Sequence, residues 1–357
     1  MPRRRRGGSG RRVDAPLALL REATGPATLA QVMAEAEARV ARGETGHLRP
    51  LPTGFQPLDE VLSGGLRPGE LLVIGGPFGV GKTIWGLQAA RNAVAGDPGA
   101  AAVYVCYEHD REHLLQRLLC LESAEQAAGA EPALTLRELS KLAFAAGDGL
   151  GLISRLRRVS RYASLVDRVE SYANRLVLVK ASGDLSTLDH IRGWVQDVAA
   201  SGPERLLLVV DYIQKVPVNW SGLQPETEVT TYLTQGLKEM AMSLGIRAIA
   251  IAASDRAGLK AKRMRLADLR GSSAMQYEAD VGLILNNKWS IVSREHLVYN
   301  PTHADAMRNW VVLSVEKNRA GRSTLDMEHA LDAAHFRIVP QGGFCRDRLV
   351  DEKVIMA

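Results

Sequence analysis

The feature that most constrains this 357-residue chain is a segment of eight residues with the pattern G-x-x-x-x-G-K-T. Its members are Gly76, Pro77, Phe78, Gly79, Val80, Gly81, Lys82 and Thr83. An apolar run at residues 71–74 precedes it and predicts a buried strand, and residues 84–92 follow it and predict a helix. A glycine-rich loop in this setting is typical of phosphate binding, because its backbone N–H groups point at the phosphates near a helix N-terminus. We therefore predict that these eight residues bind a nucleoside triphosphate.

Three polar side chains in or near this loop have predicted roles in binding ATP and Mg²⁺, the two cofactors that we expect. Lys82 is expected to reach the outer phosphates, and the Thr83 hydroxyl to take one coordination position on Mg²⁺. Asp211 follows the hydrophobic run 206–210, which predicts a strand that ends in a carboxylate. In a P-loop fold this carboxylate lies beside the loop and holds the ion, so we predict Thr83 and Asp211 as the metal-binding residues.

A carboxylate after the second predicted strand is the candidate general base. Glu108 follows the strand-like segment 103–107, and we expect this strand to lie beside the P-loop strand. A carboxylate at the C-terminal end of such a strand would reach the water in line with the γ-phosphate. Asp110 is a competing candidate, whereas we expect His109 to be a solvated histidine at the start of a helix.

Composition and cysteine content are typical of a globular protein of the cytoplasm. The residues are 46% hydrophobic and 24% charged, which supplies an ample core. No run approaches the roughly 20 apolar residues that span a bilayer, so we expect no membrane segment. The three cysteines, Cys106, Cys120 and Cys345, lack metal-ligand spacing and fit a reducing compartment.

Residues 1–26 predict a disordered basic arm, because six arginines and three glycines occur among the first twelve residues. Such an arm either contacts nucleic-acid phosphates or acts as a solubilising tail, and the sequence leaves both readings open.

A lone amphipathic helix is predicted next, within a linker segment at residues 27–45. Thr28 and Gln31 form a capping box, and Gly43 closes the segment. The apolar positions of the helix have helical spacing and are Leu29, Val32, Met33, Ala36 and Val40. Because a glycine- and proline-bearing stretch separates this helix from the rest, we expect it to dock either on its own domain or on a neighbouring subunit.

Residues 46–345 predict one α/β domain, followed by a tail at residues 346–357. Strand-like apolar runs lie at residues 71–74, 101–106, 176–179, 206–210, 248–252, 281–285 and 310–315. Helical patterns lie at residues 84–95, 111–121, 186–199 and 228–243. Short strands that alternate with helices predict a mostly parallel sheet flanked by helices on both faces, with a helical insertion between the second and third strands.

Several further motifs resemble those of RecA-like ATPases, the group that includes the DnaB, RadA and KaiC families. Residues 53–70 run into the P-loop and carry Thr-Gly-Phe, Leu-Asp and Gly-Leu-Arg-Pro-Gly-Glu. Residues 211–214, Asp-Tyr-Ile-Gln, are similar to the D-Y-L-Q of DnaB-type replicative helicases. Residues 268–280 resemble the D-L-R and A-D block of that family, and residues 317–321 resemble its K-x-R-x-G segment. The resemblance covers about residues 27–340 and implies a RecA-like P-loop NTPase core preceded by a linker helix.

The resemblance to the C-terminal domain of DnaB-type helicases implies an ATP-hydrolysing hexameric motor that acts on single-stranded DNA. Lys317 and Arg319 would enter the ATP site of the neighbouring subunit and neutralise charge on the transferring phosphoryl group, joining Lys82 and Glu108 in catalysis. The basic segment after the strand at residues 248–252 would contact DNA phosphates in the central channel. The cations of that segment are Arg256, Lys260, Lys262, Arg263 and Arg265.

Two departures from that family shape the functional expectation. Ala252 and Ala253 stand where the family usually carries Ser-Gln, and alanine has no side-chain hydrogen bond with which to relay the γ-phosphate to DNA. About fifty residues precede the ATPase domain, too few for the primase-binding N-terminal domain of the family. We therefore expect an accessory, mobile-element or defence-type helicase rather than the housekeeping one, with a loader or another protein as partner. The alternative is a RecA-like ATPase without unwinding activity that assembles with or remodels a protein partner.

Overall fold

One mixed sheet forms the centre of the protein. The structure, a computed structural model, describes residues 25–46, 48–127, 133–144, 149–220, 225–254, 260–292 and 306–350. In these ranges the sheet has the strand order β10-β8-β7-β6-β1-β5-β4-β2-β3, with β9 beside β8. The strands are β1 (Leu71–Gly75), β2 (Ala100–Cys106), β3 (Leu176–Lys180), β4 (Arg205–Asp211), β5 (Arg247–Ile251), β6 (Val281–Asn287), β7 (Trp310–Asn318), β8 (Leu325–Asp332), β9 (Arg337–Ile338) and β10 (Gly343–Phe344). The strands from β3 to β6 in this order are parallel and the remaining ones pair antiparallel, which confirms the predicted mostly parallel α/β fold.

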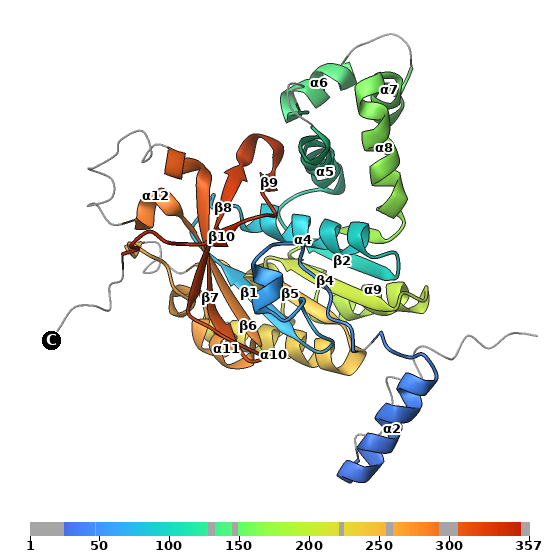
Figure 1. Cartoon of the computed structure of the whole chain (residues 1–357), viewed down its shortest axis with the longest axis vertical. Helices are drawn as coiled ribbons and strands as arrows, with labels where there is room; N and C mark the ends of the chain where they lie inside the picture. The colour runs from blue at the N-terminus through green and yellow to red at the C-terminus, as the bar shows by residue number, and fades with distance from the viewer. Residues whose placement is uncertain are drawn as a thin grey trace, which may run out of the picture.

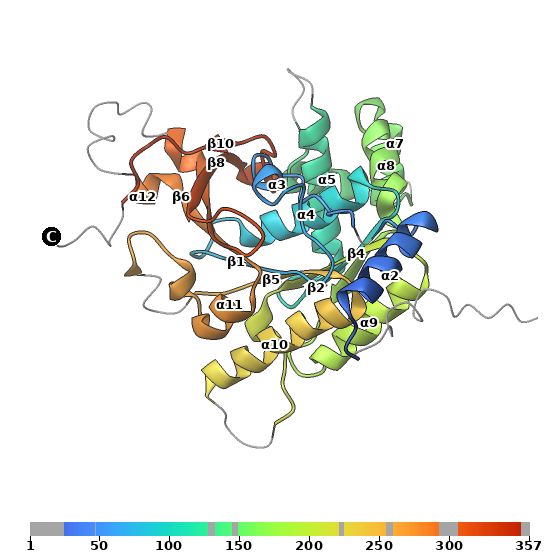
Figure 2. The same cartoon turned by 60° about the horizontal axis from the view of Figure 1, so that its bottom comes forward.

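Helices cover both faces of the sheet, as Figures 1 and 2 show. On one face lie α4 (Lys82–Gly96), α5 (Arg111–Gln126) and α8 (Ser160–Ala173), whose apolar side chains share one buried cluster with the sheet. On the other face lie α9 (Leu188–Ala200), α10 (Glu226–Leu244) and α11 (Ser272–Glu278), which share a second cluster. Because the central strands are buried on both faces, they are continuous apolar runs rather than alternating ones.

The predicted helical insertion between β2 and β3 is present. It contains α6 (Leu136–Phe144) and α7 (Leu152–Arg158), which pack with α5 and α8 around a small separate core. In Figure 1 this group rises above the sheet at the upper right. Two further helices are short, α3 (Leu58–Val61) and α12 (Lys288–Ile291).

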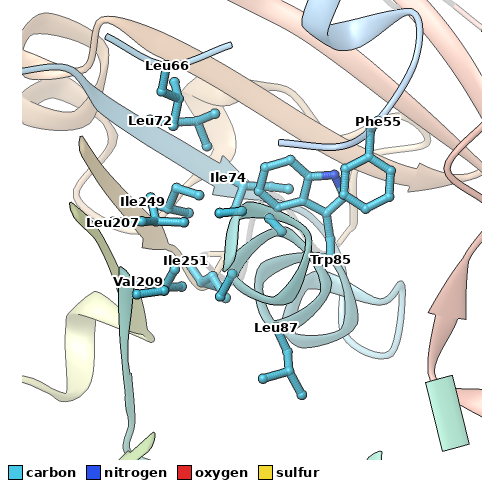
Figure 3. Close-up of a cluster of buried hydrophobic side chains, with 14 of the residues drawn as sticks. Phe55, Leu66, Leu72, Ile74, Trp85, Leu87, Leu207, Val209, Ile249 and Ile251 are labelled. Carbon is cyan, nitrogen blue, oxygen red and sulfur yellow. The ribbon is translucent and has the colours of Figure 1, made fainter. Parts of the chain in front are cut away.

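A stacked aromatic pair anchors the helix that follows the P-loop. The Phe55 and Trp85 ring centroids lie 5.4 Å apart with an interplanar angle of 15°, and both rings are buried (Figure 3). The loop that carries Phe55 is fixed by Asp59, whose carboxylate accepts hydrogen bonds from the backbone N–H groups of Thr53 and Gly54. These contacts hold the start of α4, and with it the P-loop, against the sheet.

The position of β2 differs from the sequence prediction. We expected the strand that carries Glu108 to lie beside the P-loop strand, but β1 pairs with β5 and β6, and β2 pairs with β3 and β4. The prediction was wrong because two later strands, β4 and β5, insert between β1 and β2, which chain order alone does not reveal. All of these strands are parallel, so their C-terminal ends still meet at one edge of the sheet.

The N-terminal helix α2 (Leu29–Ala41) stands apart from the sheet (Figure 1). The predicted capping box is formed, since the Thr28 hydroxyl accepts from the Gln31 N–H and the Gln31 side chain accepts from the Thr28 N–H. None of its residues is buried, and Leu29 and Met33 are 75% and 64% exposed.

The two predicted ends of the chain lie largely outside the described residues. Of the basic arm expected at residues 1–26, only residues 25 and 26 are described, and of the tail expected at residues 346–357, only residues 346–350. No helix in the described ranges has the length and apolar character needed to cross a bilayer.

Candidate active site

The P-loop turns from β1 into α4 through a backbone shape that requires glycine at two positions. Gly76 has φ 153°, and a Cβ atom there would lie 2.3 Å from the carbonyl oxygen of Leu285. Gly81 has φ 104° and is the N-cap of α4. The loop therefore delivers the N-terminus of a 15-residue helix, with its unpaired N–H groups, to a cavity of about 260 Å³. This is an arrangement that binds phosphate.

Lys82 lines this cavity. Its Nζ donates hydrogen bonds of 2.8 Å to the carbonyl oxygens of Gly76 and Pro77. Burial lowers the pKa of Lys82 to about 8, although the nearby carboxylates of Asp211 and Glu108 favour its charged form. The phosphates of a nucleotide would restore the charge on Lys82, because an anion nearby stabilises the ammonium form.

Asp211 lies at the end of β4 and is the most deeply buried carboxylate of the cavity. It accepts a 2.8 Å hydrogen bond from the Tyr104 hydroxyl and a further one from the Thr83 side chain. Burial raises its pKa above the ordinary range for aspartate. A hydroxyl and a carboxylate side by side are a hard-oxygen donor pair, so Thr83 and Asp211 fit Mg²⁺, whose charge would in turn keep Asp211 ionised.

Glu108 lines the same cavity from the turn after β2. The register between β2 and β4 pairs Cys106 with Asp211, so Glu108, two residues after Cys106, follows β2 just past the level of Asp211. The competing residue, Asp110, caps α5 by accepting a 2.7 Å hydrogen bond from the His113 N–H. Glu108 is therefore the exposed carboxylate that faces the cavity, and Asp110 has a structural task.

A cation that the sequence analysis missed, Arg117, also lines the cavity. Its guanidinium contacts the rings of His109 and His113 at 3.0 Å and lies 4.9 Å from the ring centroid of Phe336. Burial and the charge of Arg117 lower the pKa of His109 to about 4, so this histidine is neutral at pH 7 and half-buried rather than solvated. The i, i+4 spacing of His113 and Arg117 on α5 was the available sequence signal.

Ala253 lines the cavity at the end of the strand segment that includes β5. Its backbone N–H donates to the side-chain oxygen of Gln214, and the Gln214 amide donates to the carbonyl oxygen of Arg270. Gln214 thus connects the turns that follow β4 and β5. Ala253 itself presents a methyl group to the cavity, as the sequence indicated.

Lys317 and Arg319 lie at the opposite end of the sheet. The Arg319 N–H donates to the carbonyl oxygen of Asp280, and the Asp280 N–H donates to that of Leu71, the first residue of β1. The P-loop follows Gly75, the last residue of β1. The two ends of this five-residue strand lie about 13 Å apart. The Arg319 guanidinium is half-exposed and pairs with Asp280 at 3.2 Å, while Lys317 donates to the carbonyl oxygen of Tyr277 at 3.0 Å. The structure does not bring these two residues to the P-loop of their own chain.

Four of the five cations of the predicted DNA-binding segment lie in the described residues. Arg256 lies outside the described residues, and Lys260 and Lys262 are exposed. Arg263 is buried, and its guanidinium binds the Asp326 carboxylate and the Ser314 hydroxyl. The Arg265 guanidinium lies 3.1 Å from a carboxylate oxygen of Glu316. Acidic partners on β7 and β8 hold these two arginines, so the exposed cations of the segment are Lys260 and Lys262 in the described part.

Comparisons with known proteins agree with this geometry. The family model for the DnaB-like helicase C-terminal domain matches residues 50–337. The replicative DNA helicase DnaB of Leifsonia xyli subsp. xyli is 25% identical over 265 residues, which are 74% of this chain and 52% of that protein. The corresponding protein of Treponema pallidum is 29% identical over 243 residues, 66% of this chain and 48% of that protein. The chain spans about half the length of these curated relatives.

Two solved structures share the fold. One is an isolated ATPase domain, with a TM-score of 0.68 at 17% identity over 88% of this chain and 99% of its own. The other is a DnaB-like replicative helicase, solved in a study of its interactions with primase, with a TM-score of 0.63 at 18% identity over 88% of this chain and 67% of its own. At these identities the likeness concerns the fold, and the RecA-like arrangement is shared. With its P-loop, its buried strand-end aspartate and a family match over most of its length, the chain belongs to the family of DnaB-like helicase C-terminal domains.

Proposed function

We propose that this chain hydrolyses ATP as one subunit of a homo-oligomeric ring, expected to be a hexamer, that moves along single-stranded DNA in the cytoplasm. The observation that supports the proposal is the separation, within one chain, of the two groups of residues that would form the active site. The P-loop, Asp211 and Glu108 meet at the C-terminal ends of the parallel strands, whereas Arg319 and Lys317 lie near the N-terminal end of β1. A ring in which Arg319 and Lys317 of one subunit face the P-loop of the next subunit would bring the two groups together.

Each residue has a defined task in this scheme. Lys82 and the N–H groups of the P-loop bind the β- and γ-phosphates, and Thr83 and Asp211 would hold Mg²⁺, which neutralises phosphate charge. Glu108 orients the attacking water and accepts its proton. Arg319 of the adjacent subunit stabilises charge on the transferring phosphoryl group, an effect of ~10³ to 10⁵ in rate for arginines supplied in trans.

The exposed apolar stripe of α2 supports ring assembly. No residue of the stripe is buried within its own chain, in the part that the structure describes, and a short linker joins it to the ATPase domain. Burial contributes ~25 cal/mol for each Å² of apolar surface removed from water. Docking of α2 on a neighbouring subunit would bury this apolar surface and so stabilise the contact between the two subunits.

Single-stranded DNA is the proposed track. Lys260 and Lys262 are exposed in the segment after β5, and Ala253, near the start of that segment, lines the ATP cavity. The curated relatives are named replicative DNA helicases, and one structural neighbour was solved together with an analysis of its primase interactions. For this chain we propose an accessory, mobile-element or defence-type role, with a loader or another protein as partner.

A second candidate function is favoured by Ala253. A side chain without hydrogen-bonding groups at this cavity wall cannot transmit the state of the γ-phosphate to the DNA segment. A ring of this kind would use ATP to assemble with or remodel a protein partner and would not unwind DNA.

The rate of ATP hydrolysis with and without a single-stranded oligonucleotide separates the two candidates. A motor on DNA binds the oligonucleotide and hydrolyses ATP faster in its presence, with modest stimulation because Ala253 weakens the coupling. Lys82→Ala is the matched control and removes hydrolysis in both conditions. DNA binding that is absent at low salt in an intact ring would select the protein-remodelling ATPase.

A further inference from the structure

An exposed aromatic pair is formed by Trp220, on the segment between β4 and α10, and Tyr232, on α10. The Trp220 and Tyr232 ring centroids lie 5.1 Å apart with an interplanar angle of 61°, and the residues are 38% and 45% exposed. The pair borders two hollows, one shared with the start of α9 and one along α10. Neither residue belongs to a buried core cluster, so packing within the domain does not account for two large rings in this place.

The segment that carries Trp220 and the segment that leads to Lys260 follow neighbouring strands of the sheet. β4 and β5 are parallel neighbours, so the segments that follow them emerge together. Gln214, on the segment that leads to Trp220, bonds to Ala253 and to Arg270, which flank the Lys260 segment. Figure 2 shows the N-terminal end of α10 near α11 at the lower side of the molecule. The segments that carry the aromatic pair and the two lysines therefore start from neighbouring strand ends, and Gln214 joins them.

We propose that Trp220 and Tyr232 form a stacking platform for the bases of single-stranded DNA, which rests on the proposed function and adds base contacts to it. Aromatic faces bind any base, so such a platform is insensitive to sequence. The carboxylates that border the hollows, Asp189 and Glu228, repel phosphates and accept hydrogen bonds from the exocyclic amino groups of bases. The chemistry of the hollows thus suits bases, and the lysines suit the backbone.

An abasic oligonucleotide tests this platform with the full chain. Binding of a labelled mixed-sequence single strand is compared, by anisotropy at one low salt concentration, with an abasic strand of the same length and charge. The wild-type protein is expected to bind the natural strand about tenfold more tightly, the size of one stacked base. Trp220→Ala is expected to bind both strands with the affinity that the wild type has for the abasic one, and Trp220→Phe to keep most of the preference.

A control variant and the possible outcomes separate the platform from the proposed function. Phe344→Ala removes an exposed aromatic residue in β10, at the far edge of the sheet, and should change neither affinity. Equal binding of the natural and abasic strands by the wild type, with a normal salt dependence, would overturn the platform and leave the DNA motor standing. A Trp220→Ala variant that kept the tenfold preference would also overturn it. Binding of neither strand by the wild type would instead contradict the proposed function itself.

Discussion

Arg319 is paired with Asp280 at the end of the sheet that lies farthest from the P-loop of the same chain. The Asp280 carboxylate also accepts from the N–H of Leu71 and lies 2.6 Å from the Lys238 ammonium, so one buried carboxylate ties the arginine to β1 and to α10. An arginine held in this way keeps a half-exposed guanidinium at the surface. It can serve an ATP site only when that site belongs to another subunit.

ATP binding is expected to require Lys82 and to weaken at high pH. The pKa of Lys82 is about 8, and bound phosphates raise it, so binding takes up a proton once the pH exceeds 8. ATP affinity is therefore constant below pH 8 and falls by up to about tenfold per pH unit above it. Equilibrium binding between pH 7 and pH 9.5 measures this, and a flat profile would contradict it. Lys82→Ala is expected to abolish nearly all hydrolysis.

Glu108→Gln is expected to bind ATP with wild-type affinity and to hydrolyse it at least ~10²-fold more slowly, because the amide cannot accept the proton of the water. Asp110→Asn is the matched control two residues away. It retains a capping side chain for α5 and is expected to keep near wild-type turnover. Steady-state hydrolysis rates of the two variants decide the assignment. Normal turnover by Glu108→Gln would exclude it as the base.

Assembly is expected to depend on α2. Deletion of residues 1–45 should shift a hexamer-sized species toward monomers in sedimentation velocity, because the apolar stripe is lost. Met33→Asp should act in the same direction by placing a charge in that stripe, whereas Glu35→Ala, off the stripe, should not. An unchanged ring after the deletion would mean that α2 does not join subunits.

The salt dependence of DNA binding is expected to distinguish Lys260 and Lys262 from Arg263. Each phosphate neutralised on a single strand contributes ~0.7 to the slope of log affinity against log salt. Replacement of both lysines by alanine should flatten this slope by about 1.4. Arg263→Ala should leave the slope unchanged and destabilise the fold by about 3 kcal/mol, because the Asp326 carboxylate loses its cationic partner and keeps only the Ser314 hydroxyl. A flattened slope for a folded Arg263→Ala variant would show that Arg263 contacts DNA phosphates.

Local patterns were sufficient for the parts of the site that come from one strand and the turn after it. The P-loop, Asp211 and Glu108 each follow an apolar run, and parallel strands bring such positions to one edge whatever their order. The order itself required knowledge of which strands pair. For this reason the expected neighbourhood of β1 and β2 was wrong although Glu108 faces the cavity.

Contacts between segments that are far apart along the chain could not be predicted from the sequence. Phe336 reaches the cavity and meets Arg117 only because the β8–β9 turn folds over α5. Arg263 looks like any other cation of a basic run until Asp326, 63 residues later, pairs with it. The short strands β9 and β10 have no periodicity of their own and form by antiparallel pairing with β8.

The most direct test of the shared active site is a mixture of two inactive proteins. Arg319→Ala lacks the residue supplied in trans and Glu108→Gln lacks the base, so neither should hydrolyse ATP well alone. In a mixed ring some interfaces pair an intact Arg319 with an intact Glu108, and these interfaces should restore part of the wild-type rate. We predict recovery of activity on mixing, in samples whose co-assembly is verified by sedimentation of differently labelled subunits. Co-assembled rings that recover no activity would contradict an active site shared between subunits.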